Sequence, residues 1–260
     1  MSKWAAKRKK RIIIIVGITL LLIAGFIIAN LGKKTPTCVD GIQNGQETGI
    51  DCGGSCSRVC EDEVRDLIVW WERPFEVDTG LYNVVAYIDN QNLSSGIEQV
   101  NYEFRLYDRE NVLVTEPRRG TTFIEPNKRS AIFEPGLTTG DKEAYTVFFK
   151  ITSRIQWDRS LGDFAYDLFR IEEPVLINQD SAPKLSVNIE NTSRFDFTDV
   201  PITAVLYNQE GNAVAASRTY IDRMNQGILE QAFFSWPEAF TESISRIEII
   251  PRINPFLYEG

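Results

Sequence analysis

The chain has 260 residues, 43% of them hydrophobic and 25% charged, which allows one large or two small folded domains with appendages. It contains no histidine, which excludes Ser-His-Asp and Cys-His catalytic arrangements and histidine-ligated metals. The net charge of −8 is uneven: residues 1–34 hold eight basic residues and no acid, which leaves 20 basic and 36 acidic residues, or −16, for the rest. That acidic body argues against a nucleic-acid partner, since phosphate contacts need clustered cations.

The N-terminus predicts a membrane anchor. Six basic residues lie within 1–11, and an apolar run follows over 12–31. As a helix this run would be about 30 Å long, the thickness of the hydrocarbon core of a bilayer. Because only Lys33 and Lys34 follow it, the charge bias places 1–11 in the cytoplasm and the body outside the cell membrane. The alternative is a cleaved secretory signal, but such signals have a shorter apolar core of roughly 7–15 residues.

All four cysteines lie in a short stretch of the predicted stem, 32–61: Cys38, Cys52, Cys56 and Cys60. An exported body meets an oxidising compartment, so we expect two disulfides in one of three connectivities. Zinc is the alternative, but the spacing lacks the paired Cys-x2-Cys units that are common in structural zinc sites.

The loop between the first two cysteines is rich in Gly, Asn and Asp, which suit tight turns. Asp40, Asn44, Glu47 and Asp51 offer oxygen ligands along it, which makes calcium the one candidate cofactor of the chain. The alternative is that these four side chains only cap turns.

The stretch CVDGIQNGQETGIDCGGSCSRVC, residues 38–60, resembles a short module of bacterial surface and secreted proteins. The pattern of that module is Cys-x-Asp-Gly-x2-Asn-Gly-x-Glu-x-Gly-x-Asp-Cys-Gly-Gly-x-Cys. The resemblance implies an exported protein and no particular activity.

Apolar and polar residues alternate along most of the chain beyond Cys60. The alternation is clearest over 100–106 and 200–206; each segment is followed by turn residues and a second apolar alternation, at 112–114 and 213–215, which predicts two hairpins. Further strands are predicted at 67–71, 81–88, 121–124, 130–133, 145–151, 164–171, 185–189, 214–220, 229–235 and 244–250. This many short strands, with no long helical period among them, is typical of β-sandwiches.

Four short segments recur about 100 residues apart. The pairs are Glu72-Arg73-Pro74 with Glu172-Glu173-Pro174, Ile88-Asp89-Asn90 with Ile189-Glu190-Asn191, Leu106-Tyr107-Asp108 with Leu206-Tyr207-Asn208, and Phe133 with Phe233. We therefore predict two copies of one sandwich, at 62–155 and 160–257, with a linker over 152–162. Chance similarity between short apolar strands is the alternative. The predicted core positions are Phe104, Leu106, Ile202, Leu206 and Phe233.

Residues 104–108 read Phe-Arg-Leu-Tyr-Asp, a Phe-x-Leu-Tyr-Asp motif. The motif resembles the FxLYD family, small immunoglobulin-like β-sandwiches of prokaryotic cell-envelope proteins, whereas residues 204–208 lack its Phe and its acid. By position, Phe104 and Leu106 face the core, Tyr107 closes a hairpin edge and Asp108 accepts turn hydrogen bonds. The resemblance implies an architectural motif, with no catalytic residue to carry over.

No motif for chemistry is recognisable. A carboxylate pair could support glycoside hydrolysis, but 36 acids bring some pairs together by chance, and no phosphate-binding glycine loop precedes a helix. Trp70-Trp71 could stack on sugars, although a tryptophan in a sandwich strand more often packs in the core. We therefore predict that the chain is not an enzyme; a carboxylate-based, glycan-acting enzyme is the weaker alternative.

The predicted fold is mainly β: one transmembrane helix, a small disulfide-linked segment and two immunoglobulin-like β-sandwiches, connected end to end. The predicted function is binding or scaffolding at the bacterial cell envelope, anchored in the lipid bilayer through 12–31. Another envelope protein is the expected partner, since a charge of −16 repels anionic polymers and lipid headgroups. The alternative is a passive spacer or subunit of a secretion or pilus-type complex. An exposed apolar patch would favour specific binding, and a rigid interdomain contact would favour a spacer.

Overall fold

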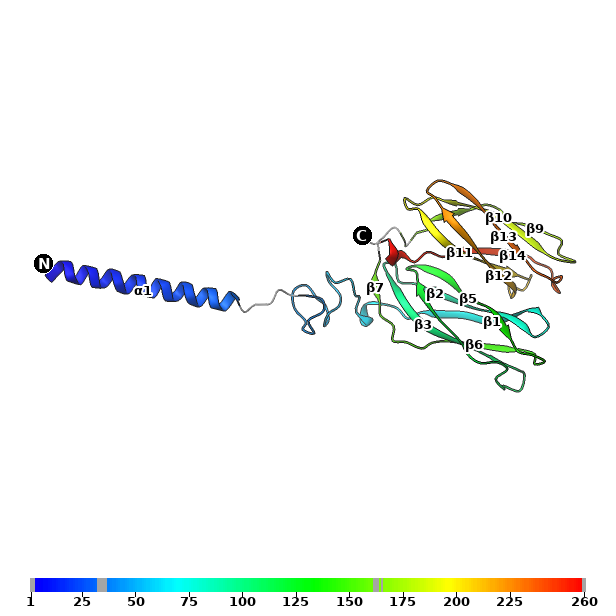
Figure 1. Ribbon diagram of the computed structural model, residues 1–260, viewed down its shortest axis with the longest axis horizontal. Coiled ribbons are helices and arrows are strands. Elements are labelled where there is room, and N and C mark those ends of the chain that lie inside the picture. The colour runs from blue at the N-terminus through cyan, green and yellow to red at the C-terminus, as the bar shows by residue number, and fades with distance from the viewer. Residues whose placement is uncertain (1–2, 32–36, 161–163, 165, 259–260) are drawn as a thin grey trace.

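The computed structural model describes residues 3–31, 37–160, 164 and 166–258. A helix at the N-terminus is followed by an irregular stem and by two β-sandwiches that lie side by side (Figure 1). The predicted stem and linker each include residues outside the described ones, at 32–36 and at 161–162.

Helix α1 (Lys3–Leu31) is long and apolar enough to cross a membrane. Its stretch Arg8–Ile28 has a mean hydropathy of 2.8, and its side chains are exposed. In lipid the helix satisfies its own backbone hydrogen bonds, and its isoleucine and leucine side chains match the acyl chains around them. A secretory signal meets the same criteria of length and composition, so the helix is confirmed and its place in a membrane stays a prediction.

The first sandwich consists of two antiparallel sheets, which we call sheet I and sheet II. Sheet I has the order β1-β2-β5; sheet II has the order β4-β3-β6, with β7 paired to the start of β3. The strands are β1 (Ile68–Asp78), β2 (Leu81–Asn90), β3 (Ser95–Tyr107), β4 (Arg118–Ile124), β5 (Lys128–Thr138), β6 (Thr146–Ile151) and β7 (Asp158–Arg159). Alternate residues of both sheets point between them, and the buried core there includes Val84, Ala86, Phe104 and Leu106.

The second sandwich has the same connectivity. Its sheet I has the order β13-β10-β8, with β9 also paired to β10, and its sheet II has the order β12-β11-β14. The strands are β8 (Phe169–Ile171), β9 (Val175–Ile177), β10 (Lys184–Asn191), β11 (Phe197–Tyr207), β12 (Ala213–Met224), β13 (Leu229–Ser235) and β14 (Arg246–Pro251). β8 and β9 together stand where β1 stands, separated by a break that contains Pro174, which has no N–H for the ladder. The prediction of two immunoglobulin-like β-sandwiches is confirmed.

One buried asparagine closes the same turn in each sandwich. Asn90 and Asn191 both end the second strand of sheet I, and both are almost fully buried. The side-chain amide of each donates to two backbone carbonyls, those of Ser95 and Glu125 in the first sandwich and those of Phe195 and Met224 in the second. Each Oδ1 also accepts the backbone N–H two residues on. The matched segments around these asparagines therefore make the same hydrogen bonds.

The sandwiches pack face to face: the outward face of sheet I of the first lies against the outward face of sheet II of the second (Figure 1). The shared buried cluster consists of Phe75, Val85, Tyr87, Ala131, Phe133, Val205, Tyr207, Ala213, Ala216 and Ile250, with Trp71 against it. The expected end-to-end arrangement is therefore wrong. β2 and β11 are apolar on both faces, so both faces of each strand have to be shielded from water by packing.

Four of the five predicted core positions are confirmed and one is wrong. Phe104, Leu106, Ile202 and Leu206 are fully buried, whereas Phe233 is 63% exposed and Phe234 occupies the core. Because Phe233 pairs with Ser186 on the outward face of sheet I, it cannot reach its own core. Its match, Phe133, faces outward in the same way and is buried only because the second sandwich covers it.

The second half of the first predicted hairpin does not form a strand. Around 112–114 only one bridge forms, between Tyr107 and Leu113, and β4 begins at Arg118. Pro117 lies between the two and cannot donate to the ladder. The corresponding segment of the second sandwich has no proline, and it forms the long strand β12.

The predicted linker is largely part of the first sandwich. Trp157 is buried in that core, and β7 pairs with β3. Burial of the large apolar ring of Trp157 stabilises the fold. This segment therefore packs on the first sandwich and does not form a free linker.

Candidate functional site

The four cysteines form two disulfides, Cys38–Cys56 and Cys52–Cys60. The expectation that all four are used is met, and no thiolate is left for zinc. The connectivity, which the spacing left open, is first to third and second to fourth. The crossed pairs tie residues 38–60 together, a stretch too short for a core of its own.

The stem is docked on the first sandwich. Val59 is buried in that core, and its N–H donates to the carbonyl of Trp157 at 2.9 Å. Arg159 binds the stem twice, through its backbone N–H to the carbonyl of Ser57 at 2.7 Å and through its guanidinium to that of Gly54 at 2.9 Å. The described part of the stem, residues 37–61, is therefore fixed to the first sandwich by these contacts.

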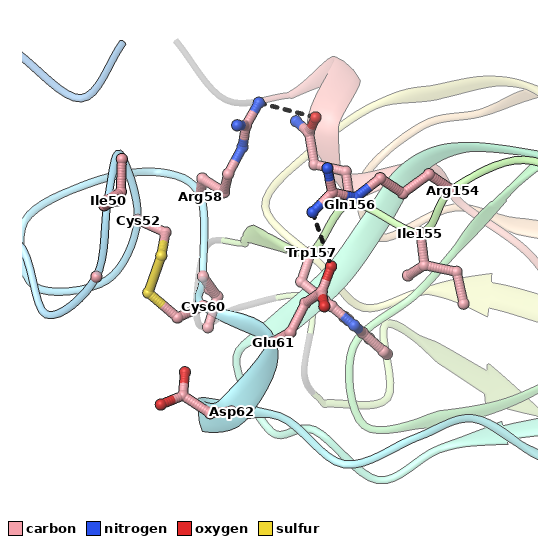
Figure 2. Close-up of a pocket in the computed structure, with 12 residues that line it drawn as sticks. Ile50, Cys52, Arg58, Cys60, Glu61, Asp62, Arg154, Ile155, Gln156 and Trp157 are labelled. Carbon is pink, nitrogen blue, oxygen red and sulfur yellow. Dashed lines mark hydrogen bonds and ion pairs between the residues drawn. A yellow bond between two sulfur atoms is a disulfide. The ribbon is translucent and has the colours of Figure 1, made fainter. Parts of the chain in front are cut away.

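A cavity of about 470 Å³ lies between the stem and the first sandwich (Figure 2). Arg58 donates to Gln156 at 2.8 Å across it, and Arg154 pairs with Glu61 at 3.1 Å. Asp62 points away from the other labelled side chains (Figure 2). The pairs Arg58–Gln156 and Arg154–Glu61 thus join the stem to the first sandwich.

The candidate calcium ligands act as turn caps. Asp51 accepts the N–H of Gly41 with both carboxylate oxygens, at 2.9 and 3.0 Å, and Asp40 accepts from the amide of Asn44 at 3.0 Å. Glu47 accepts the backbone N–H of Asn44 at 3.0 Å. Of the groups of potential ligands within 4.8 Å of one another, the described residues contain one, Glu47 with the disulfide-bonded Cys38 and Cys56. The three carboxylates do not gather around one point, and calcium binding stays a prediction.

The Phe-x-Leu-Tyr-Asp motif has the predicted architectural role. Phe104 and Leu106 fill the core, and Tyr107 packs edge-on against Phe148 with ring centroids 5.6 Å apart. Asp108 Oδ1 accepts two backbone N–H groups of the turn, at 3.1 and 2.7 Å. The motif thus contributes to the core and stabilises a turn.

The contact surface between the two sandwiches, formed by the shared buried cluster described above, is called the seam here. It contains a shared carboxylate. Glu248 accepts hydrogen bonds from the hydroxyls of both Tyr87 and Tyr207. Burial and the adjacent Glu248 carboxylate raise the pKa of both tyrosines above the usual range. A second buried pair, Arg252 and Glu125 at 3.3 Å, joins the sandwiches further along the seam. Such paired polar groups fix the relative position of two packed faces.

The outward face of sheet I in the second sandwich is exposed and apolar at one end. Val175, Ile177 and Phe233 are more than half exposed and surround an open groove of about 280 Å³. Lys184 and Ser186 also line the groove. An apolar groove of this kind on a sheet face is suited to contact with another protein surface. We therefore take this exposed face as the candidate functional site.

Both the seam and this face were missed from the sequence, although a signal for the seam was present. Residues 84–88 read Val-Val-Ala-Tyr-Ile, and 204–207 read Ala-Val-Leu-Tyr, so both strands are apolar without alternation. Unbroken apolar runs are typical of strands that are covered on both faces. Trp71 belongs to the same seam, where it stacks on Tyr87 at 5.2 Å, whereas Trp70 is exposed.

No protein-family model matches the chain, and no curated protein matches it. Among solved structures it is similar to red sea bream transglutaminase, with 7% identity and a TM-score of 0.24 over 72% of this chain and 29% of that one. It is also similar to the calcium-binding domain CBD12 of CALX1.1, with 15% identity and a TM-score of 0.21 over 68% of this chain and 75% of that one. The chain spans well under half the length of the transglutaminase. Similarities this low carry no inference about the site.

Proposed function

We propose that the chain is a membrane-anchored scaffold of the bacterial cell envelope, which binds a protein partner outside the cytoplasm and catalyses no reaction. The observation that carries the proposal is the exposed apolar face around Phe233. The equivalent face of the first sandwich, around Phe133, already serves as a protein-binding surface within the molecule. A sheet position that binds a sandwich in one copy and is exposed in the other is suited to an external protein.

The rest of the chain supports a scaffold. α1 is suited to anchoring the N-terminus in a bilayer, and the disulfide-linked stem is fixed to the first sandwich by Val59 and Arg159. The seam then fixes the second sandwich on the first. A binding face on such a body has a constant position relative to the stem. The FxLYD-like motif at 104–108 favours the same cellular location, a prokaryotic envelope.

The polar groups of the cavity between the stem and the first sandwich support a role without catalysis. Arg58, Arg154 and Glu61 there are used in contacts that hold the stem, and a general acid or base needs a group that is available to substrate. A reproducible hydrolytic activity of the purified full chain, lost on replacing one carboxylate, would contradict this part of the proposal.

The test combines topology with a mapped contact. Protease added to cells with a permeabilised outer layer should digest the body of the tagged full chain and spare a tag at its N-terminus. In the same cells, a benzophenone side chain at position 233 should give one discrete adduct with a protein identified by mass spectrometry. The matched control carries the benzophenone at Leu93, which is similarly exposed and lies on the first sandwich. A protected body, or an adduct pattern that is the same from both positions, would refute the proposal.

A further inference from the structure

The seam is formed by the outward face of one sheet I and the outward face of one sheet II. Sheet I of the first sandwich is paired with sheet II of the second. A stack of two sandwiches therefore leaves one unpaired face of each kind at its ends: sheet II of the first sandwich and sheet I of the second (Figure 1). These two unpaired faces have the same positions in their sandwiches as the two faces that meet in the seam.

On the unpaired sheet I, Phe233 stands where Phe133 stands in the seam. Phe133 is opposite Val85 in the register of β2 and β5, and Phe233 is opposite Ser186 in the register of β10 and β13. Both rings point outward from the same place in the same sheet. In the seam, the guanidinium of Arg218 lies 5.1 Å from the ring centroid of Phe133 and donates to its carbonyl at 2.9 Å.

On the unpaired sheet II, Arg119 stands where Arg218 stands in the seam. Arg218 is opposite Thr203 in the pairing of β11 and β12, and Arg119 is opposite Glu103 in the pairing of β3 and β4. The Arg119 side chain is 73% exposed and lies on the surface, bound to Glu103 at 2.7 Å. Phe148 lies on the same outward face and is 53% exposed. This face therefore offers an exposed arginine and an exposed aromatic ring as contacts for the ring of Phe233.

We propose that the unpaired sheet I of one chain binds the unpaired sheet II of a second copy of the same chain, with Phe233 against Arg119 of the neighbour. This inference rests on the proposed function and names its partner. Because the two surfaces differ, the contact is heterologous and can extend into rows of chains. The stem leaves the body along the strand direction, whereas the sandwiches stack across it (Figure 1), so added chains lie beside one another with their stems at the same end.

The test uses full chains with two different tags, co-expressed in the membrane and co-purified in detergent. Wild-type chains should co-purify, and Phe233→Asp in both chains, or Arg119→Glu in both chains, should lower the yield of the second tag at least about tenfold. A chain with Phe233→Asp mixed with a chain with Arg119→Glu should recover pairs but no longer rows, because each variant keeps the face that the other has lost. Leu93→Asp in both chains is the control. Thermal melting of every variant shows that it is folded, and Arg119→Ala replaces Arg119→Glu if the acid beside Glu103 lowers the melting temperature.

Every outcome of these experiments either supports or overturns the proposed contact between copies. Recovery of pairs in the mixture supports the inference. Equal loss in the mixture and in the single variants, or no loss in either, overturns it. An adduct from position 233 with a different envelope protein, in cells where tagged copies do not co-purify, overturns the second copy as partner and leaves the proposed scaffold function standing. Absence of any discrete adduct at 233 refutes both.

Discussion

The two sandwiches have the same connectivity but opposite outward faces. In the first, sheet I is covered and sheet II is exposed; in the second, sheet II is covered and sheet I is exposed. The inward positions are similar in both, since alternate residues of the same strands fill each core. The difference teaches that the fold of a sandwich fixes which residues point outward, whereas the neighbouring domain decides which of these are buried. Predictions can therefore compare matched positions, one in each sandwich.

The largest effect is expected at position 104, where the matched residue is Ala204. Phe104 is fully buried and contacts Tyr102 and Phe149 with ring centroids 5.7 and 5.1 Å away. Phe104→Ala should lower the free energy of unfolding by about 3–5 kcal/mol, because it leaves a cavity that the rigid strands cannot close. Denaturant unfolding of the full chain measures this. A loss below about 1 kcal/mol would show that the core can collapse around an alanine there, as the second sandwich does around Ala204.

The next effect contrasts Phe133 with Phe233. Phe133→Ala removes a ring from the seam together with its contact to Arg218, and should cost about 3 kcal/mol. Phe233→Ala removes an exposed ring, and should change the free energy of unfolding by less than about 0.5 kcal/mol in the isolated chain. Parallel denaturant titrations at low protein concentration check the pair. Equal losses at the two positions would mean that the sandwiches are not held face to face.

These pairs also show what the sequence can and cannot predict. Alternation identified Phe104 and Leu206 as buried because period two specifies the face of a strand. It could not separate Phe133 from Phe233, since burial of an outward residue depends on a sandwich a hundred residues away. Disulfide formation was predicted from the cysteine content and the expected export, but its connectivity depends on the path of the stem. The oxygens of Asp40 and Asp51 suit both an ion and a turn, and only their hydrogen bonds show which groups they contact.

Alkaline pH should weaken the seam. Tyr87 and Tyr207 keep their protons in the folded chain because burial, and then the Glu248 carboxylate, raise the pKa of each hydroxyl. In the unfolded chain they ionise near pH 10, so unfolded chains bind fewer protons above that pH. The contribution of the two protonated tyrosines to the free energy of unfolding is therefore fully present below about pH 10, and it falls as the pH rises above that value. At pH 11 each tyrosine should lower the free energy of unfolding by about 1 kcal/mol, a figure already reduced for its partial exposure to solvent.

The measurement is the melting temperature between pH 8 and pH 11, compared with that of the variant in which Tyr87 and Tyr207 are both phenylalanine. The variant should show a smaller fall above pH 10 than the wild-type chain. Parallel curves for the two proteins would assign the alkaline loss to other groups, such as Tyr102, whose pKa is raised by burial and by Glu134.

The smallest effect concerns the last residue of the motif, Asp108 in the first sandwich and Asn208 in the second. Both accept backbone N–H groups of the same turn, Asp108 from Val112 at 2.7 Å and Asn208 from Asn212 at 2.8 Å. The asparagine has a second bond, since its amide donates to Glu242 at 2.6 Å.

This extra bond gives a physical reason why the acid of the motif is absent from the second copy: a carboxylate at 208 would face the carboxylate of Glu242. Asp108→Asn keeps the acceptor and should change the free energy of unfolding by less than about 0.5 kcal/mol. Asn208→Asp should cost about 1 kcal/mol at pH 7, because it replaces a donor with a like charge. Denaturant unfolding of both variants at pH 7 checks this. A loss at 208 as small as that of Asp108→Asn would mean that Glu242 does not face this turn in solution.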